Sequence, residues 1–133
     1  MSRQRTIRTI MLQGAVAANS EAYIFSRKIG VPFSVRAIYV SWPAGSNRLV
    51  AAYPYVVTDN SPPASGKPEG TNLLDALSTT PYLVGSGDYR YIRHHYKVET
   101  ANTYILLYLV NGDGVNHVVD AYVEIEEKPD AEI

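Results

Sequence analysis

The alternation of apolar and polar positions is clearest near the end of the chain, from Val115 to Glu127. Every second residue from Val115 to Ile125 is apolar or a histidine, and most of the residues between them are polar. A period of two places one set of side chains on a core and the other set in water, as in a β-strand with one buried face. The pattern therefore predicts a strand over Val115–Glu127.

A second strand is predicted immediately before this one, over Thr103–Val110, which is almost wholly apolar. Such a composition is typical of a strand that is covered on both faces or lies at a subunit contact. Asn111–Gly114 separates the two segments, and Asn and Gly readily adopt the positive φ of a tight turn. We therefore expect Thr103–Glu127 to form a β-hairpin.

Further segments rich in β-branched and aromatic residues are bounded by clusters of Gly, Pro, Asn and Asp. They predict strands over Thr6–Leu12, Ala22–Lys28, Ser34–Trp42, Arg48–Val57 and Tyr89–Val98, with a short piece at Tyr82–Val84. Pro54 lacks a backbone donor, so its strand should lie at an edge or contain a bulge. Seven or eight strands separated by turn signals predict an all-β fold, an antiparallel β-sandwich.

Residues 58–72 are rich in proline and glycine and predict a long exposed loop. Thr71 and Asn72 are suitable caps for one short helix that would continue to Leu77 and stop before Pro81. The segments on either side of the loop contain too few strands for separate cores. We therefore expect a single domain over residues 1–133.

Composition limits the chemistry of the chain, which has 133 residues, 46% of them hydrophobic, and no cysteine. Disulfides, thiolate metal sites and a cysteine nucleophile are excluded. The longest apolar run, Tyr104–Val110, is far shorter than the roughly 20 residues of a membrane helix. We expect no membrane span.

Charge is distributed unevenly along the chain, although the formal net charge is −1. Residues 1–58 carry seven basic side chains and one acidic, whereas residues 59–133 carry five basic and twelve acidic. The extremes are a basic arm or first strand over residues 1–12, with Arg3, Arg5 and Arg8, and an acidic tail over residues 128–133. Ends of opposite sign can attract a neighbouring copy head to tail, or simply each other.

The three histidines are candidates for catalytic or metal chemistry. His94, His95 and Glu99 resemble the cupin metal motif, but the residue between the two histidines is missing, and adjacent strand residues point to opposite faces. His117 falls on the apolar side of its strand, as a core or interface histidine would. There is no Gly-x-Ser-x-Gly elbow, and the carboxylates lie mostly in turns or on the charged terminal face. We expect no catalytic residues, no metal and no cofactor; a cupin-like enzyme is the weakest alternative.

Nucleic acid is a further candidate partner, because Arg90, Arg93 and Lys97 interleave with tyrosines. On a strand, however, Arg90 and Arg93 lie on opposite faces. The sequence pI near 6.3 does not favour phosphate either. We do not expect nucleic acid as a partner, except through the N-terminal arm.

Tyrosine accounts for 11 of the 14 aromatic residues. Its apolar ring and polar tip suit surfaces that are partly buried or become buried on assembly. The alternative is that tyrosine replaces phenylalanine at sheet edges. The candidate contact residues are Tyr53, Tyr55, Tyr89, Tyr91, Tyr104 and Tyr108, together with the arginines of the arm.

A short basic arm (Arg3–Arg8), the strands Ser34–Trp42 and Arg48–Val57, a proline-rich loop and the closing pair Thr103–Glu127 together resemble small viral and phage structural proteins of the jelly-roll type. This resemblance implies a jelly-roll-like sandwich and a non-enzymatic capsid, decoration or spike subunit located in a virion. Its partners would be copies of itself or a larger coat protein. The alternative is a carbohydrate-binding sandwich, cytoplasmic or secreted, in which Tyr53, Tyr55, Tyr89 and Tyr91 stack on sugars.

Overall fold

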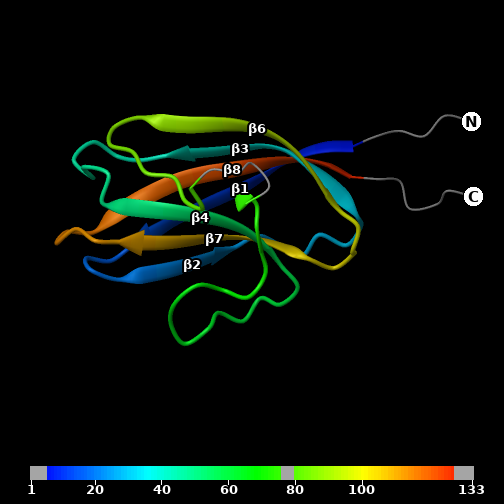
Figure 1. The fold of residues 1–133 in the computed structure, drawn as a ribbon, viewed down its shortest axis with the longest axis horizontal. Helices are drawn as coiled ribbons and strands as arrows, with labels where there is room; N and C mark the ends of the chain where they lie inside the picture. The colour runs from blue at the N-terminus through cyan, green and yellow to red at the C-terminus, as the bar shows by residue number, and fades with distance from the viewer. Residues whose placement is uncertain (1–5, 76–79, 128–133) are drawn as a thin grey trace, which may run out of the picture.

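The computed structural model describes residues 6–75 and 80–127, which form eight β-strands in two antiparallel four-stranded sheets (Figure 1). The strands are β1 (Thr6–Val16), β2 (Glu21–Phe25), β3 (Phe33–Ser41), β4 (Val50–Val57), β5 (Thr71–Asn72), β6 (Tyr89–Val98), β7 (Tyr104–Asn111) and β8 (His117–Glu127). The prediction of an all-β, sandwich-like fold is confirmed.

The strand order is β1-β8-β3-β6 in one sheet and β2-β7-β4-β5 in the other; we call them the 1-8-3-6 sheet and the 2-7-4-5 sheet. β1 pairs with β8, β2 with β7, β3 with β6 and β4 with β5. The first strand therefore pairs with the last, the second with the seventh and so on, as in one long hairpin, and successive pairs alternate between the two sheets. As a result, both ends of the described chain and the β2–β3, β4–β5 and β6–β7 connections lie at the same end of the sandwich (Figure 1).

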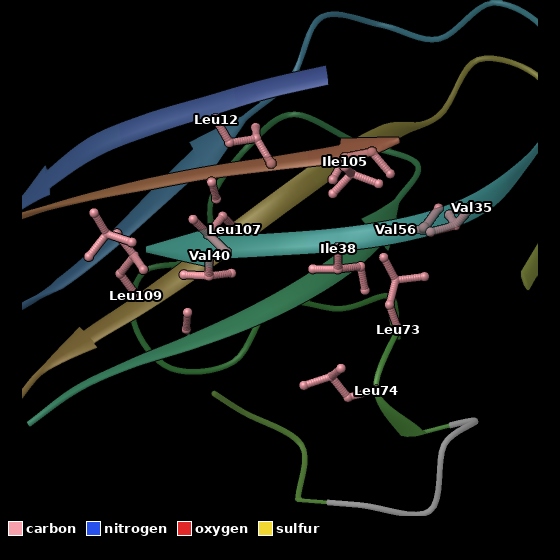
Figure 2. Packing of buried hydrophobic residues seen from close by; sticks show 14 of the residues in the cluster. Leu12, Val35, Ile38, Val40, Val56, Leu73, Leu74, Ile105, Leu107 and Leu109 are labelled. Carbon is pink, nitrogen blue, oxygen red and sulfur yellow. The ribbon is translucent and has the colours of Figure 1, made fainter. Parts of the chain in front are cut away.

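The hydrophobic core fills the space between the sheets, because the inward positions of the long strands are almost all apolar. In β8, buried residues alternate with exposed or half-buried ones as far as Ile125. Burial of alternate residues is what a period-two pattern produces when one face of a sheet packs on another sheet. Figure 2 labels ten core residues from both sheets and the β5 region: Leu12, Val35, Ile38, Val40, Val56, Leu73, Leu74, Ile105, Leu107 and Leu109.

The predicted hairpin over Thr103–Glu127 is wrong, because β7 and β8 lie in opposite sheets. The turn that joins them is a connection between sheets, and none of residues 111–114 has a positive φ. Asn111 is 2% exposed, and its Nδ2 donates to three carbonyl oxygens, those of Val16, Ala17 and Val115. The asparagine therefore serves as a buried link between the ends of β1, β7 and β8.

The predicted short helix is not found in the described part of its range, which extends to Asp75; the rest lies outside the described residues. Thr71 and Asn72 instead form β5, which pairs with Val56 and Tyr55 of β4. The Asn72 side chain accepts a hydrogen bond from the Leu74 backbone N–H, which closes a turn. Leu73 and Leu74 are fully buried, so core packing determines this segment instead of helix propensity. No helix in the described chain is long and apolar enough to cross a membrane.

In β4, the backbone nitrogen and carbonyl of Pro54 point away from β7. Its carbonyl accepts from Leu73 N–H, and the backbone of Ala52 on the same side bonds Leu83. β5 covers only Tyr55 and Val56, so this side of β4 is close to an edge. The proline therefore costs no hydrogen bond to β7. β4 nevertheless lies between β7 and β5, and its register with β7 is continuous, so the prediction of an edge strand or a bulge is wrong.

Candidate interaction face

A row of one methionine and three tyrosines crosses the outer face of the 1-8-3-6 sheet. The backbone register aligns Met11 of β1 with Tyr122 of β8, then Tyr39 of β3, then Tyr91 of β6. The two ends of the row are open to solvent: Met11 is 68% exposed and Tyr91 is 44% exposed. The two middle rings are half-buried. We call this the Met–Tyr row.

The two middle rings of the Met–Tyr row stack on each other, and Tyr89 beside the row stacks on one of them. Tyr39 and Tyr122 lie 4.7 Å apart between centroids with an interplanar angle of 12°, and Tyr39 and Tyr89 lie 5.4 Å apart at 30°. Burial raises the pKa of Tyr122, and the nearby Glu124 carboxylate adds to this effect. Stacked rings lose little further freedom on binding, so the centre of the row is a pre-arranged surface.

Other large apolar side chains widen this surface. Tyr89 is 60% exposed, Ile7 60% and Val118 49%, and all three project from strands of the 1-8-3-6 sheet. The outer face of an antiparallel sheet is usually polar. Exposed apolar side chains gathered on such a face make it a candidate contact surface.

Charged residues lie along one side of the Met–Tyr row. The next row of the register contains Thr9, Glu124, Ala37 and Arg93, and the one after it contains Ile7, Glu126, Ser34 and Lys97. A β-bulge between Val35 and Ala37 presents Arg36, whose Nη1 lies 2.6 Å from Glu126 Oε1. Arg36, Tyr91, Arg93 and Glu124 line a shallow hollow of about 140 Å³.

The outer face of the 2-7-4-5 sheet also carries tyrosines, but there they are covered by the chain itself. Tyr55 is 5% exposed and Tyr108 is 3% exposed, and they pack with Val57 and Leu106 in a second hydrophobic cluster. Tyr53 and Tyr104, also predicted contact residues, are half-buried against this cluster. The cluster is therefore closed to a partner at Tyr55 and Tyr108.

The proline-rich loop provides part of this cover. Tyr23 Oη donates to the Gly66 carbonyl over 2.5 Å, and Gly66 N–H donates to Glu21 Oε1 over 3.0 Å. The ammonium of Lys67 lies 5.8 Å from the centroid of the Tyr53 ring, a cation–π distance. The sequence predicts an exposed loop. In the structure, these contacts hold the loop against the outer face of the 2-7-4-5 sheet.

The contacts around Glu21 shift the pKa values of two side chains. The hydrogen bond from Gly66 N–H holds the pKa of Glu21 below its usual value, with a smaller contribution from Tyr108. Burial raises the pKa of Tyr108, and the hydrogen bond and negative charge of Glu21 raise it further. Both shifts favour an ionised Glu21 beside a neutral Tyr108.

The basic arm of the sequence is placed only in part. Arg3 and Arg5 lie outside the described residues, whereas Arg8 lies in β1 and its Nη1 is 2.9 Å from Glu127 Oε2 of the neighbouring β8. From the sequence, the oppositely charged ends could attract a neighbouring copy or each other. The pair of Arg8 and Glu127 is an attraction within one chain.

The three histidines lie at separate places in the described structure, and only His117 contacts a carboxylate. His94 Nε2 contacts the Leu73 carbonyl, while His95, the next residue, is exposed on the other side of β6. His117 is buried, as the sequence predicted, and its Nε2 lies 2.8 Å from Asp113 Oδ2. Among the described residues no group of three or more His, Asp or Glu side chains is arranged to hold a metal ion.

Sequence reasoning identified Tyr89 and Tyr91 but did not single out Met11, Tyr39 and Tyr122 as contact residues. The usable signal was that each of the three occupies an outward position in the alternation of its own strand. What was missing was the register, which aligns residues from four strands that are distant in sequence.

Comparisons with known proteins give little beyond this geometry. No protein-family profile and no curated protein matches the chain. Among solved structures, the chain is similar to a chain of the one described as "Cyanophage Pam1 capsid asymmetric unit", with 11% sequence identity and a TM-score of 0.46. The match covers 96% of this chain and 89% of that chain. The function is therefore argued from the residues of this chain.

Proposed function

We propose that this protein is a non-enzymatic structural subunit of a virion, which assembles with copies of itself or with a larger coat protein. The observation that carries the proposal is the exposed Met–Tyr row on the outer face of the 1-8-3-6 sheet. Burial of such a surface against another protein removes apolar side chains from water and lowers the free energy.

The strand pairing also supports a jelly roll. An eight-stranded, two-sheet arrangement with pairs 1-8, 2-7, 3-6 and 4-5 is a double Greek key, and jelly rolls recur in viral capsid subunits, lectin domains and cupins. Because the fold hosts several functions, the choice among them comes from the surface. That surface is an apolar row on a sheet face, which favours an assembly role.

The experiment is light scattering of the full chain during size exclusion, from low to high micromolar concentration. We expect the wild type to assemble with rising concentration, and we expect Tyr91→Ser and Met11→Ser to shift it towards monomer. Leu49→Ser is the matched control, because Leu49 is 45% exposed but lies in the β3–β4 connection, away from the face. A strictly monomeric wild type, or equal effects of all three variants, would contradict the proposal.

A carbohydrate-binding module is the second candidate. It is favoured by the hollow beside Tyr91, where an exposed ring adjoins Arg36, Arg93 and Glu124. A sugar can stack on such a ring while charged groups bond its hydroxyls. In this case a glycan array gives specific binding that Tyr91→Ala abolishes, and the chain stays monomeric.

A further inference from the structure

We propose that the outer face of the 1-8-3-6 sheet packs on the same face of a second copy of this chain, around a two-fold axis parallel to the strands. This inference rests on the proposed function and names its partner and geometry. It follows from three properties of the face: its size, the symmetry of its apolar row and the placement of its charges.

The face is large enough for a stable dimer. Four strands about 4.8 Å apart and about ten residues long, at about 3.4 Å per residue, span about 650 Å². A stable interface of ordinary size buries about 800 Å² per partner. Two such sheets packed face to face reach this size once side-chain relief is included, and aligned packing is a common way for sheets to meet.

The Met–Tyr row is complementary to itself under this axis. Rotation about a line parallel to the strands, midway between β8 and β3, places β6 of one copy over β1 of the other and β3 over β8. Within the row, Tyr91 then meets Met11, and Tyr39 meets Tyr122. A methionine sulfur against an aromatic ring and a pair of stacked tyrosines are both favourable contacts.

The charges select this axis over the alternative. β6 presents Arg93 and Lys97 outward, whereas β8 presents Glu124 and Glu126 in the same two rows. With the axis parallel to the strands, the basic β6 of one copy lies over the β1–β8 side of the other, within reach of its acids. With the axis across the strands, along the Met–Tyr row, each strand would lie antiparallel over its own copy. Glu124 of β8 would then face Asp120 of the other copy, and like charges that face each other are costly.

The central charged pair is available for such a contact. Among the described residues, neither Arg93 nor Glu124 has an ion-pair partner, whereas Glu126 already pairs with Arg36. Arg93 is exposed and Glu124 is half-buried beside Tyr122. In the proposed dimer, Arg93 of each copy lies over Thr9 of the other, one strand away from Glu124, so its long side chain can reach that carboxylate diagonally. The interface contains this pair twice.

The test is charge reversal followed by rescue between two different chains. Arg93→Glu alone and Glu124→Arg alone each place like charges at both copies of the pair, and each should weaken self-association at least about tenfold. When the two variants are mixed, both pairs become attractive again, so a mixed dimer should form with affinity close to the wild type. Native mass spectrometry identifies the mixed dimer, and sedimentation gives its dissociation constant.

The controls separate this inference from the proposed function. Rescue between chains cannot come from contact between Arg93 and Glu124 inside one chain, and circular dichroism verifies that each variant is folded. Arg27→Glu is the matched control, since Arg27 is exposed in the β2–β3 connection and should leave assembly unchanged. A wild type that assembles but ignores both reversals, or variants that fail to rescue each other, would overturn this inference alone. A monomeric wild type would overturn both.

Discussion

At the scale of single residues, tyrosines on strands have two different environments. Tyr91 is 44% exposed on the 1-8-3-6 sheet, whereas Tyr108 is 3% exposed on the 2-7-4-5 sheet. The sequence could predict that both lie on strands, because alternation and composition are local signals. It could not predict which ring is covered, because Tyr23 and Tyr53, the rings that lie against Tyr108, come from strands distant in the sequence.

Two glycines in turns give a matched test of packing. A Cβ at Gly85 would lie 2.5 Å from Trp42 Cε3 and 2.4 Å from Asp88 Oδ1, and the Trp42 ring is 2% exposed and cannot easily move. We expect Gly85→Ala to lower the free energy of unfolding by about 1–3 kcal/mol. At Gly114 a Cβ would meet nothing within 4 Å, so Gly114→Ala should be neutral or slightly stabilising. Urea unfolding of the two variants checks this, and equal midpoints would contradict it.

Asn111 gives a second prediction at this scale. Its amide donates to three carbonyl oxygens and its Oδ1 accepts from Asp113 N–H, all at a site that is 2% exposed. Asn111→Asp replaces the donor with an acceptor facing those carbonyls, and we expect a loss of more than about 3 kcal/mol in unfolding free energy. Asn116→Ala is the control: it removes one exposed hydrogen bond, to Ala18 N–H, and should cost about 1 kcal/mol or less. Similar losses for both variants would contradict a linking role for Asn111.

At the scale of elements, the sequence predicted strands better than their partners. Tyr89–Val98 was located to the residue, and Val115–Glu127 to within two residues of β8. The hairpin was wrong because alternation reports which residues face a core but not which sheet a strand joins. Connections through Asn and Gly fit a passage between sheets as well as a tight hairpin. Two of the hydrogen bonds that Asn111 donates go to carbonyls about 95 positions away, which no local pattern reports.

The contact between Glu21, Tyr23 and Gly66 predicts how the loop responds to pH. The pKa of Glu21 is lowered in the folded chain by the Gly66 N–H, so its stabilising contribution is complete above the unfolded pKa and is lost as the pH falls through the lowered value. We expect Glu21→Ala to increase protease cleavage within residues 58–70 at neutral pH and to flatten the loss of stability below about pH 4.5. Proteolysis rates and unfolding curves from neutral to acidic pH measure the two effects.

Glu69→Ala is the control for this contact, since Glu69 is an exposed carboxylate of the same loop. The phenolate absorbance gives an independent measurement, because Glu21 contributes to the raised pKa of Tyr108. Alkaline titration of Glu21→Ala should therefore show a tyrosine that ionises earlier than in the wild type. If loop cleavage were the same in Glu21→Ala and in wild type, the loop would not be held by this carboxylate.

At the scale of the whole molecule, the two halves of opposite charge lie side by side. β1 and β8 pair along their full length, with Thr6 opposite Glu127, and both ends of the described chain leave the sandwich together (Figure 1). Because Thr6 and Glu127 pair at one end of the sandwich, the described part of the chain does not place a basic pole and an acidic pole at opposite ends. In the proposed dimer, polarity between copies comes instead from the face, where the basic β6 and the acidic β8 run parallel to each other.

Two truncations separate the role of the arm from that of the sheet. Removing residues 1–5 leaves every described strand pair in place, so the circular dichroism spectrum and the unfolding free energy should stay unchanged. Removing residues 1–12 also deletes the buried Leu12 and most of the pairing of β1 with β8, and we expect a loss of several kcal/mol or failure to fold. If the arm clasps neighbours through Arg3 and Arg5, the shorter truncation weakens assembly of a chain that is still folded. If assembly depends on the Met–Tyr row alone, the shorter truncation leaves it unchanged, because Met11 is retained.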